Sequence, residues 1–280
     1  MANLNLFDIF MWTVRRSEND IVNMYDTLSP MMQVTTNGEM LNFGHWDKDS
    51  TTPLSAQNHL CDIVAELSEF SNARNLVDVG SGLLGPAKKW NVDFPGIKIF
   101  SININYSQLK NSKNMPYDRI VCLNSTSRLL PFGDNSVDRV VALESAQHFK
   151  KLDEFINESK RILNSDGILV LAIPVVTEQV STIKDLGILS FTWTSEHFTL
   201  DHVTSEIKKS GLAIDDTRMI GENVYSPMAD YYMDNRESLK KSILTKYPSY
   251  VEKILFNSIR KMKQVSENKI IDYALIKCRL

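Results

Sequence analysis

Short runs of β-branched and other apolar residues alternate with helical segments along the middle of this chain. Runs of this length and composition are typical of strands buried on both faces of a sheet. Strands that alternate with helices build a mostly parallel sheet through right-handed crossovers. The pattern therefore predicts a doubly wound α/β core. The predicted strands are Asn75–Val79, Ile97–Ile102, Arg119–Leu123, Val137–Leu143 and Ile168–Ile173, and the helical segments include Tyr106–Lys113 and Leu152–Leu163.

The sequence that follows this core adds two more predicted strands. Thr199–Ser210 has helical spacing, and Gly211 is a residue at which such a helix stops. Leu212–Ile220 and Ile270–Leu280 have the composition of strands. The complete sheet is therefore predicted to have seven strands, most of them parallel.

The chain is predicted to consist of a cap and a core domain. Residues 1–60 precede the first strand and include the helical pattern Asn19–Leu28, so we expect a helical N-terminal cap. Residues 61–280 are expected to form the domain that contains the sheet. Two segments are inserted into it: a lid at about residues 175–198, rich in apolar and aromatic residues, and a helical insert at about residues 235–264.

A glycine-rich turn follows the first predicted strand. Its sequence, Gly80-Ser-Gly-Leu-Leu-Gly85-Pro, lies directly before a helix. Glycines at such a turn allow a tight bend and let a nucleotide-like ligand approach the backbone. Dinucleotide enzymes share this loop, but they have an acidic residue after the second strand where Asn103 stands here. The loop alone leaves open a nicotinamide-dependent oxidoreductase and a purely structural turn.

Four motifs follow one another between about residues 75 and 174: VDVGSGLLGPA, SININYSQL, LLPFGDNSVDRVVALESAQHF and ESKRILNSDGILVLAIP. Their order resembles the class I S-adenosylmethionine (SAM)-dependent methyltransferases. It is most similar to the small-molecule branch, which includes sugar O-methyltransferases, tocopherol-type and prenyl C-methyltransferases and cyclopropane fatty acid synthases. The upstream LNFGHW and the final IIDYALIKCRL fit the same branch. The resemblance implies a Rossmann-like fold, SAM as cofactor and S-adenosylhomocysteine (SAH) as product.

The resemblance also implies which residues bind the cofactor. The turn after the first strand would face the methionine and ribose portions, and the end of the second strand would flank ribose and adenine. The aromatic segment before the core would touch the methionine end. The implied cofactor-binding residues are Trp46, Asp78, Gly80, Ser81, Gly82, Asn103, Ile104, Gln108, Thr126, Ser127 and Glu144.

Three residues depart from the pattern of the superfamily. Asn103 stands where many members have the acid that binds ribose, and Thr126 aligns with an aspartate that receives the adenine amino group. Leu84 stands where many relatives have a third glycine. These departures support an alternative hypothesis, in which the protein binds a cofactor or ligand on a methyltransferase fold but is catalytically silent.

Two residues after the fourth predicted strand are the candidates for catalysis. Methyl transfer is an in-line displacement, so the protein supplies positioning and, for an acceptor with a proton, a base. Glu144 and His148 lie at the carboxyl edge of the sheet, where ligands of open α/β sheets bind. Histidine suits proton removal at neutral pH. The alternatives are that His148 caps or packs against the next helix, and that Glu144 contacts cofactor or substrate.

The segment after the sixth strand is expected to form a loop that lines the acceptor site. It contains Tyr225 and Tyr232, which are our candidate substrate residues, although ordinary packing would equally explain them. Apolar and aromatic residues in the cap and lid favour a small, partly apolar acceptor such as an isoprenoid or lipid. Sugars and amines remain open.

Composition argues against several other classes of function. The chain has 31 basic and 34 acidic residues and a pI near 6.0, so it lacks the positive charge typical of nucleic-acid binding. Cys61, Cys122 and Cys278 have neither disulfide nor zinc spacing, which favours a reducing, cytoplasmic compartment. The histidines are scattered, so we expect no metal.

The first 16 residues contain a helical pattern of apolar side chains. Leu4, Phe7, Phe10, Met11 and Val14 recur with helical spacing, which predicts either weak contact with a membrane surface or a lid helix packed on its own domain. The sequence does not set the oligomeric state, and a homodimer is one option.

Overall fold

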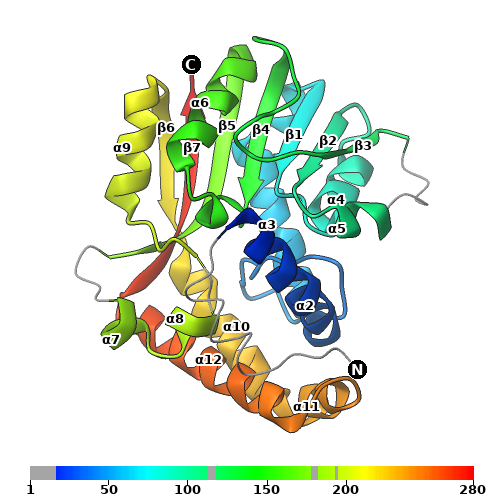
Figure 1. Ribbon diagram of the computed structural model, residues 1–280, viewed down its shortest axis with the longest axis vertical. Helices are drawn as coiled ribbons and strands as arrows, with labels where there is room; N and C mark the ends of the chain where they lie inside the picture. The colour runs from blue at the N-terminus through cyan, green and yellow to red at the C-terminus, as the bar shows by residue number, and fades with distance from the viewer. Residues whose placement is uncertain (1–16, 112–117, 178–181, 193–194) are drawn as a thin grey trace.

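The computed structural model describes residues 17–111, 118–177, 182–192 and 195–280. Its sheet has seven strands in the order β3-β2-β1-β4-β5-β7-β6 (Figure 1). Strand β7 is antiparallel to both of its neighbours, and the other pairs are parallel. The predicted α/β class and strand number are therefore confirmed. The strands are β1 (Asn75–Val79), β2 (Lys98–Asn103), β3 (Ile120–Asn124), β4 (Val137–Leu143), β5 (Leu163–Val176), β6 (Ala213–Met219) and β7 (Ile271–Arg279).

Helices cover both faces of the sheet, because successive side chains of a strand point to opposite faces. Leu76 belongs to a core cluster with helices α3 and α4, whereas its neighbour Val77 belongs to a second cluster with α6 and α9. These helices, with α5, are α3 (Pro53–Leu67), α4 (Gly85–Asp93), α5 (Tyr106–Asn111), α6 (Leu152–Ile162) and α9 (Leu200–Ser210).

A second group of helices lies beyond one end of the sheet, below it in Figure 1. Here Met24 of α2 packs with Ile243, Tyr247 and Val251, which come from the other end of the chain. This places the N-terminal cap against the C-terminal helices. The group consists of α2 (Glu18–Thr36), α7 (Thr182–Leu186), α8 (Leu189–Thr192), α10 (Tyr225–Asp234), α11 (Arg236–Leu244) and α12 (Ser249–Glu267).

The structure adds detail to one sequence-based expectation in this region and corrects another. The helical insert expected at about residues 235–264 contains two helices, α11 and α12, because Pro248 lacks the N–H that a continuous helix needs and occupies the N-cap of α12. The segment that contains Tyr225 and Tyr232 was expected to be a loop and is helix α10. The apolar residues of this segment recur with a spacing that buries one side of a helix.

Helix α3 crosses the boundary that the sequence suggested at residue 60. Thr52 caps its first turn by accepting from Ser55 N, Pro53 occupies the first helical position, and Leu60 and Val64 are fully buried in the core. The division into residues 1–60 and 61–280 stays a prediction. The proposed membrane-contact segment, residues 1–16, and Trp193 of the lid lie outside the described residues.

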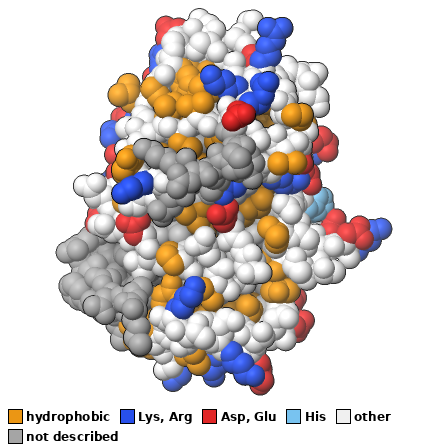
Figure 2. Space-filling view, turned by 90° about the vertical axis from the view of Figure 1, so that its right-hand side faces the viewer, with side chains coloured by type: hydrophobic (Ala, Val, Ile, Leu, Met, Phe, Trp, Pro, Cys, Tyr) orange, Lys and Arg blue, Asp and Glu red, His pale blue; other side chains and the backbone are white. Residues whose placement is uncertain are grey.

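The described surface carries mixed charge. On the face shown in Figure 2, basic and acidic side chains are interspersed, with apolar side chains between them. This face therefore shows no extended area of one charge sign. Separately, none of the described helices is both long enough and apolar enough to cross a bilayer.

Candidate active site

The glycine turn after β1 brings two strand ends together. Gly80 has φ +84°, a left-handed conformation that favours glycine, and its N–H donates to Ile102 O over 2.8 Å. A Cβ added to Gly80 would lie 2.3 Å from Ser145 Cβ. The turn thus packs directly on the residue that follows Glu144, beyond the end of β4. Leu84, at φ +66°, is buried in the core and does not line the cavity beside the turn.

Replacing Gly80 with alanine should therefore destabilise the fold. The added methyl group meets Ser145 and the backbone leaves its favoured region, so we expect a loss of about 3 kcal/mol in the free energy of unfolding. Gly96→Ala is the matched control, since no atom lies within 4 Å of its added Cβ. Urea denaturation of both variants measures the difference. Equal unfolding free energies would contradict the close packing at this turn.

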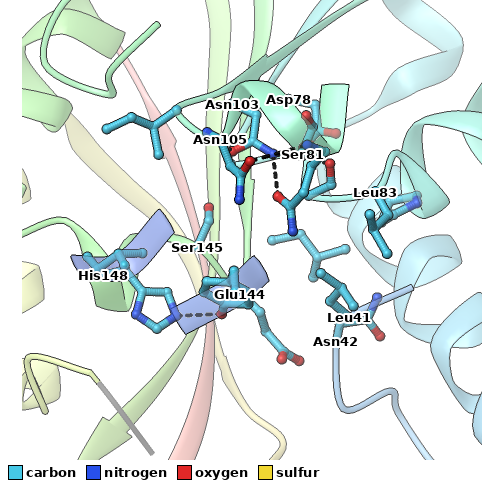
Figure 3. Close-up of a pocket in the computed structure, with 18 of the residues that line it drawn as sticks. Leu41, Asn42, Asp78, Ser81, Leu83, Asn103, Asn105, Glu144, Ser145 and His148 are labelled. Carbon is cyan, nitrogen blue, oxygen red and sulfur yellow. Dashed lines mark hydrogen bonds between the residues drawn. The ribbon is translucent and has the colours of Figure 1, made fainter. Parts of the chain in front are cut away.

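A cavity of about 100 Å³ lies beside the glycine turn (Figure 3). It is lined by Asp78 of β1, by Gly80, Ser81 and Gly82 of the turn that follows, and by Asn103 of β2. Across the described part of the chain, Asp78 Oδ2 and Ser81 Oγ are buried and have no hydrogen-bond partner. Burial raises the pKa of Asp78 to about 7. Such unpartnered buried groups are expected where a ligand normally supplies the partner.

The end of β2 is linked to the cap helix through hydrogen bonds. Asn103 Nδ2 donates to Gly82 O (3.1 Å) and to Gln108 Oε1 (2.8 Å), which ties the glycine turn to α5. Gln108 Nε2 then donates to Ser29 Oγ of α2 over 2.9 Å. Asn105 Nδ2 donates to Asp26 Oδ1 of the same helix over 2.8 Å. Helix α2 therefore covers this side of the cavity.

A second, larger cavity of about 540 Å³ adjoins the first, and the residues that line both include Gly80, Asn103, Ile104 and His148. Ser127 lines this second cavity. Thr126 is not among its lining residues, and its hydroxyl donates to the Glu18 carboxylate of α2 over 3.1 Å. The two cavities together form one cleft along the carboxyl ends of β1, β2 and β4.

Glu144 occupies a strained position at the end of β4. Its φ is +49°, which is unfavourable for a residue with a side chain, and such strain is frequent at functional sites. Its Oε1 accepts from Phe43 N (2.9 Å) and from Tyr273 Oη (3.1 Å). Burial raises the pKa of Glu144 to about 8, so the carboxyl group is mainly neutral at pH 7.

His148 lies in the short 3-10 helix after β4 and contacts the cap. Its Nε2 is 2.8 Å from Tyr25 Oη of α2, and the two rings meet edge to face. The side-chain amide of Gln147 lies 3.3 Å from the same nitrogen. Burial raises the pKa of Tyr25, which keeps its hydroxyl protonated. The phenol can therefore donate to an unprotonated Nε2.

An apolar chamber of about 220 Å³ lies on the other side of these residues. It is enclosed by α2, α8, α10 and α12, and five methionines contribute to its wall. The chamber and the cavity beside the glycine turn have common lining residues. The residues that line both are Tyr25, Leu41, Asn42, Glu144 and His148.

Not all of the predicted site residues line these cavities. Trp46 is buried behind the site, where its indole N–H donates to Phe43 O and its ring meets Tyr231. Tyr225 is fully buried and donates to Asp272 O over 3.2 Å. Tyr232 packs in a cluster between α10 and α12, and burial raises its pKa to about 12.

Other residues of the site were not singled out from the sequence. Tyr25 lies in the helical pattern recognised at Asn19–Leu28, and Asn42 lies in the LNFGHW segment, so both had a sequence signal. The methionines of α2 and α12 had none, because apolar residues at helical spacing are ordinarily core residues.

Residues 77–171 match the family described as a methyltransferase domain. The chain is 23% identical over 266 residues to erythromycin 3''-O-methyltransferase of Saccharopolyspora erythraea, covering 88% of this chain and 86% of that protein. Its fold is similar to that of the mycolic acid cyclopropane synthase CmaA1 complexed with SAH and CTAB (TM-score 0.78, 15% identity, 94% and 98% covered). It is also similar to the cyclase SpnF (TM-score 0.77, 20% identity, 94% and 96% covered).

The fold and the cleft define an α/β enzyme that binds a nucleoside-type cofactor at the carboxyl edge of its sheet. With the matches above, the chain is a class I SAM-dependent methyltransferase. The cleft fits this cofactor. The unpartnered Asp78 carboxyl can accept from the ammonium of its methionine portion, and Ser81 can bind the carboxylate. Among the described residues, no group of three or more His, Cys, Asp or Glu side chains has metal-binding geometry.

Proposed function

We propose that the enzyme transfers the methyl group of SAM to a hydroxyl oxygen of a small, partly apolar metabolite held in the chamber. One observation supports this most directly: the cofactor cleft and the chamber meet at five shared residues, so two ligands can touch there. The similarity to a protein named as an O-methyltransferase supports transfer to oxygen.

In this proposal the residues at the junction have distinct roles. Bound SAM supplies an electrophilic methyl group on its sulfonium. His148 accepts the proton of the acceptor hydroxyl at Nε2, where Tyr25 Oη lies 2.8 Å away in this structure. The acceptor hydroxyl thus takes the place of the phenol, or shares the nitrogen with it. Glu144, held by Phe43 N and Tyr273 Oη, positions the ligands at the boundary.

The cofactor is held by residues that the two strand ends supply. Asp78, Gly80, Ser81 and Gly82 face the first cavity and would bind the methionine portion. The ribose and adenine portions would lie along Asn103, Ile104, Gln108 and Ser127, which line the continuous cleft.

Two of the three departures from the family pattern, Leu84 and Asn103, do not support the catalytically silent alternative. Leu84 packs into the core and leaves the cavity open. The Asn103 amide lies beside the glycine turn, where its Nδ2 donates to Gly82 O and Gln108 Oε1 and its Oδ1 accepts from Asn105 N, so a bound ribose would exchange for one of these contacts. Amide groups of this kind can bind ribose hydroxyls, without the charge that a carboxylate would add.

The test is a transfer assay with SAM labelled in its methyl group. The full chain is incubated with a panel of apolar alcohols, amines and alkenes, and products are identified by mass spectrometry. We expect label in methyl ethers, and calorimetry should show SAH binding. SAH binding without transfer to any member of the panel would favour the silent alternative. No binding of SAM or SAH to folded protein would reject the proposal.

A further inference from the structure

Most of the side chains in the wall of the chamber are hydrocarbon or thioether. Its five methionines are joined by leucine, isoleucine and valine side chains from α2, α8 and α12. Its ionisable side chains other than tyrosine, Glu144 and His148, lie at the end that it shares with the cofactor cleft, and no lysine, arginine or aspartate is among the described residues that line it. A charged group placed in such surroundings loses its hydration without gaining a partner, which is strongly unfavourable. The methionines that line it are Met24, Met31, Met32, Met228 and Met262.

The hydroxyl groups in the far wall of the chamber are already used within the protein. Thr35 and Thr36 each donate to Met32 O over 2.9 Å, one turn back along α2. Thr192 Oγ1 and Ser258 Oγ lie 3.0 Å apart, and Ser258 also donates to Ile254 O. These groups therefore do not change the apolar character of the far end.

The polar end of the chamber is different, because it contains amide atoms that lack a hydrogen-bond partner in the described part of the protein. Asn42 is 5% exposed and lines both cavities, and neither Nδ2 nor Oδ1 makes a hydrogen bond to the described part of the protein. Gln147 is 4% exposed, and its Oε1 likewise has no partner there. A buried amide left unpaired is unfavourable, so a ligand group that both donates and accepts is expected beside it.

We propose that the methyl acceptor is an uncharged, largely hydrocarbon alcohol whose hydroxyl binds Asn42 and whose carbon skeleton fills the methionine-lined end of the chamber. A hydroxyl matches an amide, since each offers one donor and at least one acceptor. The apolar end of the chamber disfavours phosphorylated, carboxylated and ammonium-bearing acceptors, because a charge there would have no partner. This inference rests on the proposed methyl transfer and adds the chemical class of the acceptor to it.

The five methionines of the chamber also affect which hydrocarbon skeletons it can hold. Methionine side chains are unbranched and flexible, so they fit irregular apolar shapes better than leucine or isoleucine does. The chamber should therefore accept hydrocarbon skeletons of different shape, while the Asn42 end fixes the position of the hydroxyl. We expect the preference for a neutral hydroxyl to be stronger than the preference for one skeleton.

The experiment compares binding of matched neutral and charged probes to the full chain in the presence of SAH. The probes are farnesol with farnesyl phosphate, and 1-dodecanol with dodecyl phosphate. We expect each alcohol to bind at least about tenfold more tightly than its phosphate. Equal or tighter binding of the phosphates, or no binding of either alcohol, would overturn the inference.

Variants of Asn42 test the assigned contact. Asn42→Leu has nearly the same shape without polar atoms, and should weaken alcohol binding by about tenfold while retaining SAH binding. Asn42→Ala should act in the same direction, and Asn268→Leu, at an exposed position, is the matched control. If the Asn42 variants lose SAH affinity but keep alcohol affinity, the contact belongs to the cofactor and the inference is wrong.

The outcomes also separate this inference from the proposed function. Alcohol binding without methyl transfer would contradict the proposed function alone. Methylation of a phosphorylated acceptor would support methyl transfer and contradict the neutral acceptor.

Discussion

Replacing His148 with asparagine is expected to lower kcat by about 10²–10⁴-fold, the contribution typical of a positioned general base. Asparagine keeps a polar group of similar reach but cannot accept the proton of the acceptor. Steady-state kinetics with the best alcohol from the transfer assay measures the loss. Because His148 is only one of many residues along the cleft, SAH binding should be retained.

Two further variants make this result interpretable. His202→Asn replaces a histidine on α9, where it stacks on Phe198 away from the cleft, and should leave kcat unchanged. Tyr25→Phe removes the phenol that lies 2.8 Å from His148 Nε2 and should reduce kcat by less than loss of the histidine does. A His148→Asn enzyme that turns over at the wild-type rate would show that His148 only packs against the following helix.

The sheet could be predicted from sequence because each strand contains its own signal. Buried strands read as apolar runs, and β1 and β4 were predicted with the bounds that the structure has. The turn at Gly80 was also predictable, since its conformation depends on residues adjacent in the chain. The part of the candidate site that follows β1, β2 and β4 was located for the same reason.

The chamber could not be predicted, because its walls come from opposite ends of the chain. Met24 and Met31 of α2 face Val251 and Met262 of α12, and no local pattern in either segment identifies the other. Each helix alone looks like an ordinary amphipathic helix. The same limit applies to Tyr225, which is buried and donates to Asp272 O, 47 residues away in the chain.

Replacing Asp78 with asparagine should make the ligand-free protein more stable at alkaline pH and weaken its hold on the cofactor. In the folded protein, burial raises the pKa of Asp78 from 3.8 to about 7. Between these two values the folded chain holds a proton that the unfolded chain has released, so the free energy of unfolding falls as the pH rises. The rise of the pKa by about 3 corresponds to a loss of as much as about 4 kcal/mol in the free energy of unfolding at pH 8.

Asparagine cannot ionise, so this loss between pH 4 and 7 should be absent from the variant. Glu144 produces a fall of the same sign, through its raised pKa of about 8, but it does so in both proteins. The difference in the free energy of unfolding between wild type and Asp78→Asn therefore reports on Asp78 alone. It should grow up to about pH 7 and then level off. Urea denaturation at several pH values measures it, with Asp153→Asn, at an exposed position, as control.

The same substitution should weaken SAH binding at pH 8, because the ammonium of the ligand loses a carboxylate partner in a buried site. A charged hydrogen bond of this kind contributes about 1.5–3 kcal/mol, which predicts a loss of about 10- to 100-fold in affinity by calorimetry. Parallel pH profiles for wild type and variant, together with unchanged SAH affinity, would place the carboxyl outside the cofactor site. A gain in stability with a loss of binding would show that Asp78 is kept at a cost to the fold because the ligand requires it.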